Sequence, residues 1–294
     1  MGNTIFATLR INQWAKSAFI LAPALFTLEI LNPEHFRHLI LGVMGFSLIA
    51  SSVYILNDIL NASEDRLHPV KRHRPIASGK LSPVSGVGIV IVLLPLGMLG
   101  LYLANPLASM WALGYFLLML TYTLVLRRFF IIDIIVIAIG YVIRVEVGGA
   151  LIEEPLSRWL LLCTFTIAFF LALIKRRQEL SSLQDKSVAS GRTSLDKYPT
   201  LAILDGWVNV LAGMTILCYA LYTVDPDTIA KHQTSGLLYT IPVVIYGIFR
   251  YQKLAFTGRA GEDPAKLIIR DVGMIAVVVV WAIAVLAILF IARL

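Results

Sequence analysis

Carboxylate and amide side chains gather in one short stretch of the chain, directly before a cationic run that ends at Pro75. If a single helix continues through this stretch, four oxygen-bearing side chains share one face, since helical residues advance by about 100° each: Asn57, Asp58, Asn61 and Asp65. Mg²⁺ prefers oxygen ligands and is held by one or two carboxylates together with substrate phosphates. We therefore predict that these four residues bind Mg²⁺ and that Asp58 and Asp65 are catalytic. The alternative is a polar helix end at a water interface.

The cationic run that follows suits the phosphate groups of a substrate. Arg presents a planar fork to phosphate oxygens and Lys a compact charge, so a diphosphate would be neutralised by the metal on one side and by this run on the other. We predict catalytic roles for Lys71 and Arg74, and phosphate contacts for Arg66, His68 and Arg72. The alternative explanation is the positive charge that cytoplasmic loops carry for topological reasons.

A second cationic cluster begins at Lys175 and Arg176 and is followed by Arg192 and Tyr198. We predict that these residues, together with Glu179, bind substrate by contacting a second phosphate or a sugar hydroxyl. Lys175 and Glu179 are four residues apart, so on a helix they face together. An internal salt bridge is therefore the structural alternative for this pair.

Ionisable residues within apolar segments are functional candidates, because a charge inside a bilayer is costly. Asp133 lies inside an apolar run and is predicted to bind substrate, with pairing to Arg127 or Arg128 as the alternative. Arg127 is itself a substrate-binding candidate. Arg144 lies deeper in the same run, where a structural role and a substrate-binding role are equally open. Lys16, at the start of the first apolar run, is predicted to contact a lipid phosphate.

The composition indicates that membrane helices position these groups. Hydrophobic residues make up 58% of the 294 residues, charged residues 15%, and the mean hydropathy is +0.81, which places the chain in the membrane class. Nine apolar runs predict nine transmembrane helices: 17–31, 40–60, 84–104, 107–126, 129–152, 159–174, 201–223, 236–249 and 272–292. The runs that end at Ile174 and Phe249 are shorter than the roughly 20 residues that a bilayer requires. We expect flanking residues to extend them.

The distribution of Lys and Arg predicts the orientation of these helices. Twenty of the 25 precede the first run or fall in alternate connecting loops, and cytoplasmic loops carry the positive excess. The N-terminus is therefore expected in the cytoplasm and the C-terminus outside, with the active site at the cytoplasmic face of a bacterial inner membrane. No polar linker interrupts the helices, so residues 1–294 are expected to form a single all-α membrane domain. Topology explains the net charge of +7, and nucleic acid is not needed as a partner.

Together these residues resemble the UbiA superfamily of membrane-embedded prenyltransferases, and within it the polyprenyl-phosphate phosphoribosyltransferase branch. The resemblance runs nearly end to end, and the His-Pro, Lys and Arg-Pro continuation of the acidic motif is its most specific part. It rests on the following residues: Arg10, Gln13-Trp14, Lys16, the stretch from Asn57-Asp58 to Arg74-Pro75, Asp133, Gly140, Arg144, Lys175-Arg176, Glu179, the stretch from Arg192 to Tyr198, Arg250-Tyr251, Gly261-Glu262 and Arg270-Asp271.

This resemblance implies nine helices around a central cavity, with Mg²⁺ at its cytoplasmic end. It also implies transfer of a 5-phosphoribosyl group from phosphoribosyl diphosphate to a long, decaprenyl-like polyprenyl phosphate, with release of diphosphate. The chain departs from the family pattern at one position. The family has Asn followed by Asp four and eight residues later, whereas the middle position here is Asn61. An amide oxygen can ligate Mg²⁺ but carries no charge, and Asp58 is a candidate for the missing charge.

Two other functions remain open from the sequence. A UbiA-type prenyltransferase would use the same acidic motif to move an isoprenyl group from an isoprenyl diphosphate to an aromatic or lipid acceptor. A transporter of phosphorylated lipids or anions would need charged groups along a path through the bilayer, whereas here the charge gathers on one face, with Arg144 as the main exception. A homo-oligomer is compatible with the sequence.

Overall fold

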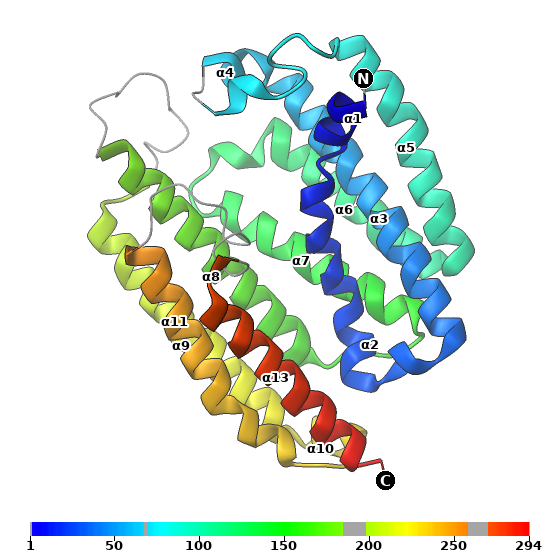
Figure 1. Cartoon of the computed structure of the whole chain (residues 1–294), viewed down its shortest axis with the longest axis vertical. Helices are drawn as coiled ribbons and strands as arrows, with labels where there is room; N and C mark the ends of the chain where they lie inside the picture. Colours follow the sequence, from blue (N-terminus) through cyan, green and yellow to red (C-terminus); the bar gives the residue numbers. More distant parts are fainter. Residues whose placement is uncertain (1, 68–69, 185–197, 258–269, 294) are drawn as a thin grey trace. The chain divides into compact units, whose positions relative to one another are not determined.

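The computed structural model describes residues 2–67, 70–184, 198–257 and 270–293, and these ranges contain helices and connections but no strand. The chain divides into two compact units (Figure 1). Unit 1 consists of Met1–Leu25, Glu29–Arg128 and Ile143–Pro155, and unit 2 of Phe26–Leu28, Phe129–Val142 and Leu156–Leu294. The helix α7 (Ile132–Leu151) contributes residues to both units. The expectation of a single domain remains a prediction.

The helices of unit 1 begin where local sequence signals place them. Asn32, Ser82 and Asn105 each accept a backbone N–H bond through the side chain, and each is followed by proline at the first helical position; both features favour helix initiation. The unit contains, with α2 reaching its boundary, α1 (Gly2–Leu9), η1 (Ile11–Leu21), α2 (Ala22–Thr27), η2 (Glu29–Leu31), α3 (Pro33–Leu60), α4 (Ala62–Leu67), η3 (Lys71–His73), α5 (Pro83–Ala104), α6 (Pro106–Leu124) and η4 (Leu126–Arg128).

The helices α3 and α5 pack along one another and form the frame of unit 1 (Figure 1). Their backbones approach closely at Gly45 and Gly97: a Cβ atom on Gly97 would lie 2.6 Å from the Gly45 carbonyl oxygen and 2.9 Å from Ile49 Cγ1. Phe46, Ile49 and Leu101 are fully buried beside this crossing. Because α3 ends in the acidic motif and α5 begins after the cationic run, their packing fixes both ends of the segment that carries the predicted site.

The first apolar run is a broken helix. Arg10 adopts a left-handed backbone conformation (φ 51°, ψ 49°), the 3₁₀ helix η1 follows it, and α2 is a separate short helix. Hydroxyl contacts attach this segment to α3: Trp14 Nε1 donates to Ser51 Oγ at 3.0 Å, and Ser47 Oγ donates to Ser17 Oγ at 2.9 Å. The N-terminal segment therefore lies along α3 through polar contacts as well as apolar packing.

Unit 2 is a helical bundle with a core that includes Phe170, Leu204, Val208 and Ile248. The helix α8 packs along α9, and α11 contacts both α9 and α13. These elements are α8 (Arg158–Gln184), α9 (Leu201–Val224), α10 (Pro226–His232), η5 (Gly236–Thr240), α11 (Ile241–Thr257) and α13 (Val272–Ile291). These helices bring together the residues of the second cationic cluster that the structure describes.

A bidentate ion pair joins α11 to the beginning of α13. Arg250 Nε and Nη2 donate to the two carboxylate oxygens of Asp271 at 2.8 and 3.2 Å. Asp271 also caps α13 by accepting the Met274 backbone N–H at 2.7 Å. Gly273 leaves room for the guanidinium, because a Cβ atom there would clash with it.

Within the described ranges, seven helices are long and apolar enough to cross a membrane, and they coincide with seven of the nine predicted runs: α3, α5, α6, α7, α8, α9 and α13. The runs that end at Ile174 and Phe249 are extended as expected, since α8 continues to Gln184 and α11 to Thr257. The first and eighth runs are interrupted where Pro23 and Pro242 begin a new helical segment, because proline has no N–H to continue the preceding one. The count of nine spans and the orientation of the termini remain predictions.

Candidate functional site

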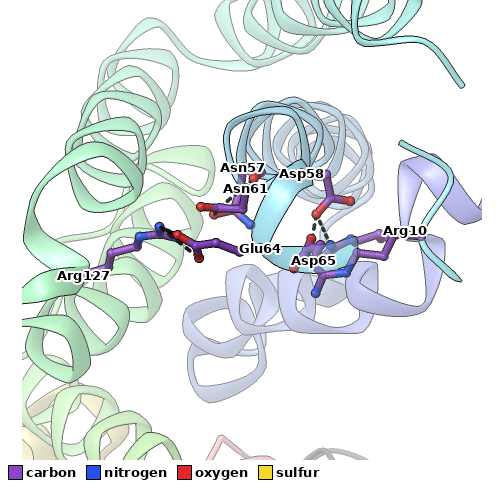
Figure 2. A network of polar contacts seen from close by, with 8 residues as sticks. Arg10, Asn57, Asp58, Asn61, Glu64, Asp65 and Arg127 are labelled. Atoms are coloured by element: carbon purple, nitrogen blue, oxygen red, sulfur yellow. Dashed lines mark hydrogen bonds and ion pairs between the residues drawn. The ribbon is translucent and has the colours of Figure 1, made fainter. Parts of the chain in front are cut away.

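The acidic motif lies where α3 passes into α4. The helix α3 ends at Leu60, and Asn61 interrupts it with φ −108° and ψ 14°. Backbone hydrogen bonds nevertheless continue across the interruption, from Asn61 N to Asn57 O at 3.1 Å and from Asp65 N to Asn61 O at 2.9 Å. The expected helical register is therefore kept, although the helix is not continuous. Within that register the four predicted metal ligands form two pairs (Figure 2).

The first pair consists of Asp58 and Asp65, which are only 5% and 4% exposed. One atom, Arg74 Nη1, lies 3.0 Å from Asp58 Oδ1 and 2.6 Å from Asp65 Oδ2. Arg10 Nη2 lies 2.5 Å from the same Asp58 Oδ1, and its guanidinium lies over the Tyr54 ring at 5.1 Å. Two arginines thus neutralise two buried carboxylates.

The second pair consists of Asn57 and Asn61 on the adjoining side of the helix (Figure 2). Asn61 Nδ2 donates to Asn57 Oδ1 at 2.9 Å and to the Asn57 carbonyl at 2.7 Å. One turn further, Glu64 forms an exposed ion pair with Arg127 Nη2 at 3.2 Å. Asn61 therefore stabilises the helix end through its amide nitrogen.

The donor set fits a hard divalent cation. The two carboxylates converge on a single positively charged nitrogen, and the amide oxygens of the Asn pair belong to adjacent turns. Mg²⁺ is usually bound by one or two carboxylates and completes its shell with water and phosphate, so two aspartates suffice. Among the described residues, no three His, Cys, Asp or Glu side chains form a metal-binding group. Any metal held here would therefore need oxygen ligands from amides, waters or substrate.

Arg74 of the cationic run forms ion pairs with both carboxylates, while Lys71 and Arg72 are exposed on η3. Arg66 Nε, on α4, donates to the Ala77 carbonyl at 3.2 Å and so attaches α4 to the loop that precedes α5. His68 lies outside the described residues. The loop presents at least two accessible cations next to the buried acidic pair.

Unit 2 brings together a second group of predicted residues around Asp133, which is 1% exposed. Tyr198 donates its hydroxyl to Asp133 Oδ1 at 2.5 Å, and Arg176 Nε lies 3.4 Å from Asp133 Oδ2. Arg176 Nη1 also donates to Glu179 at 2.8 Å. Burial and the neighbouring carboxylate raise the pKa of Tyr198, so its phenol remains a hydrogen-bond donor.

These contacts add partners to the residues for which the sequence suggested ion pairs. Asp133 contacts Arg176 of α8, while Arg127 contacts Glu64. Arg176 is the residue that pairs with Glu179, and Lys175 is exposed. Arg192 lies outside the described residues.

Arg144 and Lys16 both lie in unit 1, on different elements. Arg144 is 4% exposed and lies between the rings of Phe46 and Tyr115 at 5.0 and 4.7 Å, with Nη2 donating to the Tyr115 hydroxyl at 3.0 Å. An aromatic cage of this kind stabilises a cation in a low-dielectric surrounding, which favours the structural interpretation of Arg144. Lys16 is half-buried on η1.

Sequence reasoning does not assign Arg10 to the site, although it contacts Asp58. The two residues are 48 positions apart and no local pattern links them. The sequence signal that could have identified Arg10 as a site residue is the family resemblance, which rests in part on Arg10. Its left-handed backbone is a second indication, since non-glycine residues in this conformation concentrate at functional sites.

Residues 18–272 match the UbiA prenyltransferase family. The chain belongs to this family. Among its relatives, decaprenyl-phosphate phosphoribosyltransferase of Mycobacterium tuberculosis is 29% identical over 278 residues, covering 91% of this chain and 88% of that protein. The protein of the same name from Corynebacterium glutamicum is 28% identical over 288 residues, covering 96% and 85%. The family resemblance inferred from the motifs is therefore confirmed.

Solved structures of UbiA homologues share the fold. A homologue from Archaeoglobus fulgidus, solved bound to GPP and Mg²⁺, superposes with a TM-score of 0.70 at 14% identity, covering 98% of this chain and 99% of that one. A structure of digeranylgeranylglyceryl phosphate synthase gives a TM-score of 0.64 at 16% identity. This UbiA family member is thus an all-helical, multi-pass membrane protein with the UbiA fold.

Proposed function

We propose that this UbiA family member transfers a 5-phosphoribosyl group from phosphoribosyl diphosphate to a polyprenyl phosphate and releases diphosphate. The observation that carries the proposal is the similarity, over 91% of the chain, to an enzyme named decaprenyl-phosphate phosphoribosyltransferase. The buried pair Asp58 and Asp65 beside Arg10 and Arg74 supports chemistry on a diphosphate. The excess of Lys and Arg in alternate loops supports a reaction at the cytoplasmic face, and the bacterial relatives support a bacterial inner membrane.

In this proposal the acidic motif binds the diphosphate group of the donor through a metal ion. Asp58 and Asp65, with Asn57 and Asn61, would hold Mg²⁺, which supplies charge stabilisation for the departing diphosphate. Lys71, Arg72 and Arg74 are drawn from one loop and contact the same diphosphate, as preorganised cations that lower the cost of its developing charge. Arg66 and His68 follow the acidic motif in the sequence and complete the predicted phosphate contacts.

The second cluster would bind a second phosphate or a sugar hydroxyl of a substrate. Arg176, oriented by Asp133 and Glu179, can bind such a phosphate together with Lys175 and Arg192. Tyr198, whose hydroxyl remains protonated, supports this orientation through its bond to Asp133. Lys16 remains a candidate for the lipid phosphate, Arg127 for substrate binding, and Arg144 for a structural or a substrate-binding role.

The acceptor needs no strong general base. A phosphate monoester has a second pKa of about 6, so its oxygen arrives as an anion. That oxygen forms the new bond to the anomeric carbon of the ribose, while the bond from this carbon to the diphosphate oxygen breaks and the diphosphate retains the electron pair. The task of the cationic side chains is therefore to bind anionic substrates and not to transfer a proton.

A second candidate is transfer of an isoprenyl group from an isoprenyl diphosphate to an aromatic or lipid acceptor. The specific observation in its favour is the fold shared with a homologue from Archaeoglobus fulgidus that was solved bound to GPP and to DMAPP. It would use the same acidic motif. The two candidates differ in the group that the second cluster must bind.

The test is a product assay on the purified full chain with Mg²⁺. One set of reactions contains phosphoribosyl diphosphate and polyprenyl phosphates of several lengths; the other contains isoprenyl diphosphates with aromatic acids. We expect a lipid-linked phosphoribose in the first set, and its loss in Asp65→Asn but not in the neighbouring Glu64→Gln. Product only in the second set would reject phosphoribosyl transfer in favour of the second candidate.

A further inference from the structure

We propose that Arg10 and Arg74 compete with the divalent cation for Asp58 and Asp65, so that the metal enters this site only together with a diphosphate. The inference rests on the metal–diphosphate chemistry of the proposed function and holds for either candidate donor. It assigns Arg10 to the binding site and gives Arg74 a second role beyond contacting phosphate.

The first step is that guanidinium nitrogens take the positions a cation would use. Arg74 Nη1 bridges both carboxylates, and Asp58 Oδ1 accepts from Arg10 and Arg74 at once. A Mg²⁺ ion binds its oxygens at about 2.1 Å, so it cannot share Asp58 Oδ1 with two guanidinium groups that lie 2.5 and 3.0 Å from it. Binding of the metal alone would also leave two positive side chains beside a divalent ion.

The second step is that the arginines can move while their backbone stays in place. The side chains of Arg10 and Arg74 are 19% and 24% exposed, against 6% for each carboxylate, so they reach the carboxylates from the more open side. The loop of Arg74 is fixed by Ser78 N donating to Arg74 O at 2.8 Å and Leu81 N donating to Pro75 O at 3.0 Å. Rotation of the side chains is therefore sufficient to release the carboxylates.

The third step is that a diphosphate provides a better partner for the released arginines. Guanidinium groups form bidentate, charge-assisted bonds to phosphate oxygens, and Arg10 is additionally supported by the Tyr54 ring. When metal and diphosphate arrive together, the metal takes the carboxylates and the arginines take the phosphates. Every charge then has a partner, which metal alone does not achieve.

The test is isothermal titration calorimetry of the purified full chain with MgCl₂ alone and with preformed Mg–diphosphate. We expect Arg74→Met and Arg10→Met to bind Mg²⁺ alone more tightly than wild type, and Mg–diphosphate more weakly, each by at least about tenfold, from the charge removed near the ion. A purely structural ion pair predicts no gain in affinity for Mg²⁺. The opposite signs of the two changes distinguish the roles.

Arg177→Met is the matched control, because Arg177 also pairs with a carboxylate, Asp205 at 2.8 Å, but within unit 2. Its two affinities should equal those of wild type. Adding Asp58→Asn to Arg74→Met should abolish the gained Mg²⁺ affinity, which assigns that affinity to this site. If Arg74→Met does not fold, Arg10→Met alone decides the question.

Equal or weaker Mg²⁺ binding by the folded arginine variants would overturn the proposal, as would a wild-type chain that does not bind Mg–diphosphate. The titrations contain neither phosphoribosyl donor nor lipid. Their outcome is therefore independent of whether the product assay supports phosphoribosyl transfer.

Discussion

The glycine contact between α3 and α5 allows a stability prediction with an internal control. Replacing Gly97 by Ala places a Cβ atom 2.6 Å from the Gly45 carbonyl oxygen, where ordinary contacts begin at 3.4 Å. The backbones must separate by about 0.8 Å, and overpacking of this kind costs about 1–3 kcal/mol. Ala gains up to about 1 kcal/mol over Gly in helix propensity. We therefore expect Gly97→Ala to lower the free energy of unfolding by up to about 2 kcal/mol.

Gly88 lies on the same helix, and nothing lies within 4 Å of a Cβ atom placed there. Gly88→Ala should therefore show only the gain in helix propensity. In thermal unfolding of the detergent-solubilised protein, the two variants should differ in Tm by on the order of 5 °C, since 1 kcal/mol corresponds to about 2–4 °C in chains of 150–250 residues. A Tm for Gly97→Ala equal to or above that of Gly88→Ala would refute the reasoning.

Three further predictions concern the site and one buried histidine. Asp65→Asn should lower turnover about 100-fold or more, as expected when transition-state charge loses its support, whereas Glu64→Gln, an exposed neighbour, should retain activity within about threefold; equal losses would reject the assignment. Tyr198→Phe removes a hydrogen bond to the buried Asp133 carboxylate, and should cost about 1.5–3 kcal/mol in the free energy of unfolding, measured as a lower Tm. Burial lowers the pKa of His232 to about 4 from 6.5, so between these values the unfolded chain binds a proton that the folded chain does not. Stability should be complete above pH 6.5 and decline toward pH 4, with a smaller decline in His232→Gln; parallel profiles would contradict this.

Much of the fold follows from signals that are local in the sequence. Apolar runs of about 20 residues identify the spanning helices because only helices satisfy their own backbone in lipid. Asn32, Ser82 and Asn105, each followed by proline, mark the beginnings of three of them. The first run misleads for the same reason, because its apolar composition hides the break between the 3₁₀ helix η1 and α2.

Helical periodicity predicts only those parts of the site that lie within one helical stretch. Spacing predicts that Asn57, Asp58, Asn61 and Asp65 share one face of the helix, but it reveals neither their division into two pairs nor how the carboxylates are neutralised. That depends on Arg10, which arrives from a distant segment and is positioned by packing along α3. Long-range pairings of this kind carry no periodic signal.

The position of Arg10 also bears on how the protein is made. Chains emerge from the ribosome N-terminus first, so Arg10 precedes Asp58, and Arg74 follows both. When the end of α3 reaches the membrane surface, its buried carboxylate already has a cation available, and an uncompensated charge need not be inserted. The contact between Arg10 and Asp58 thus requires only residues that are already synthesised when α3 is complete, whereas the contact with Arg74 forms later.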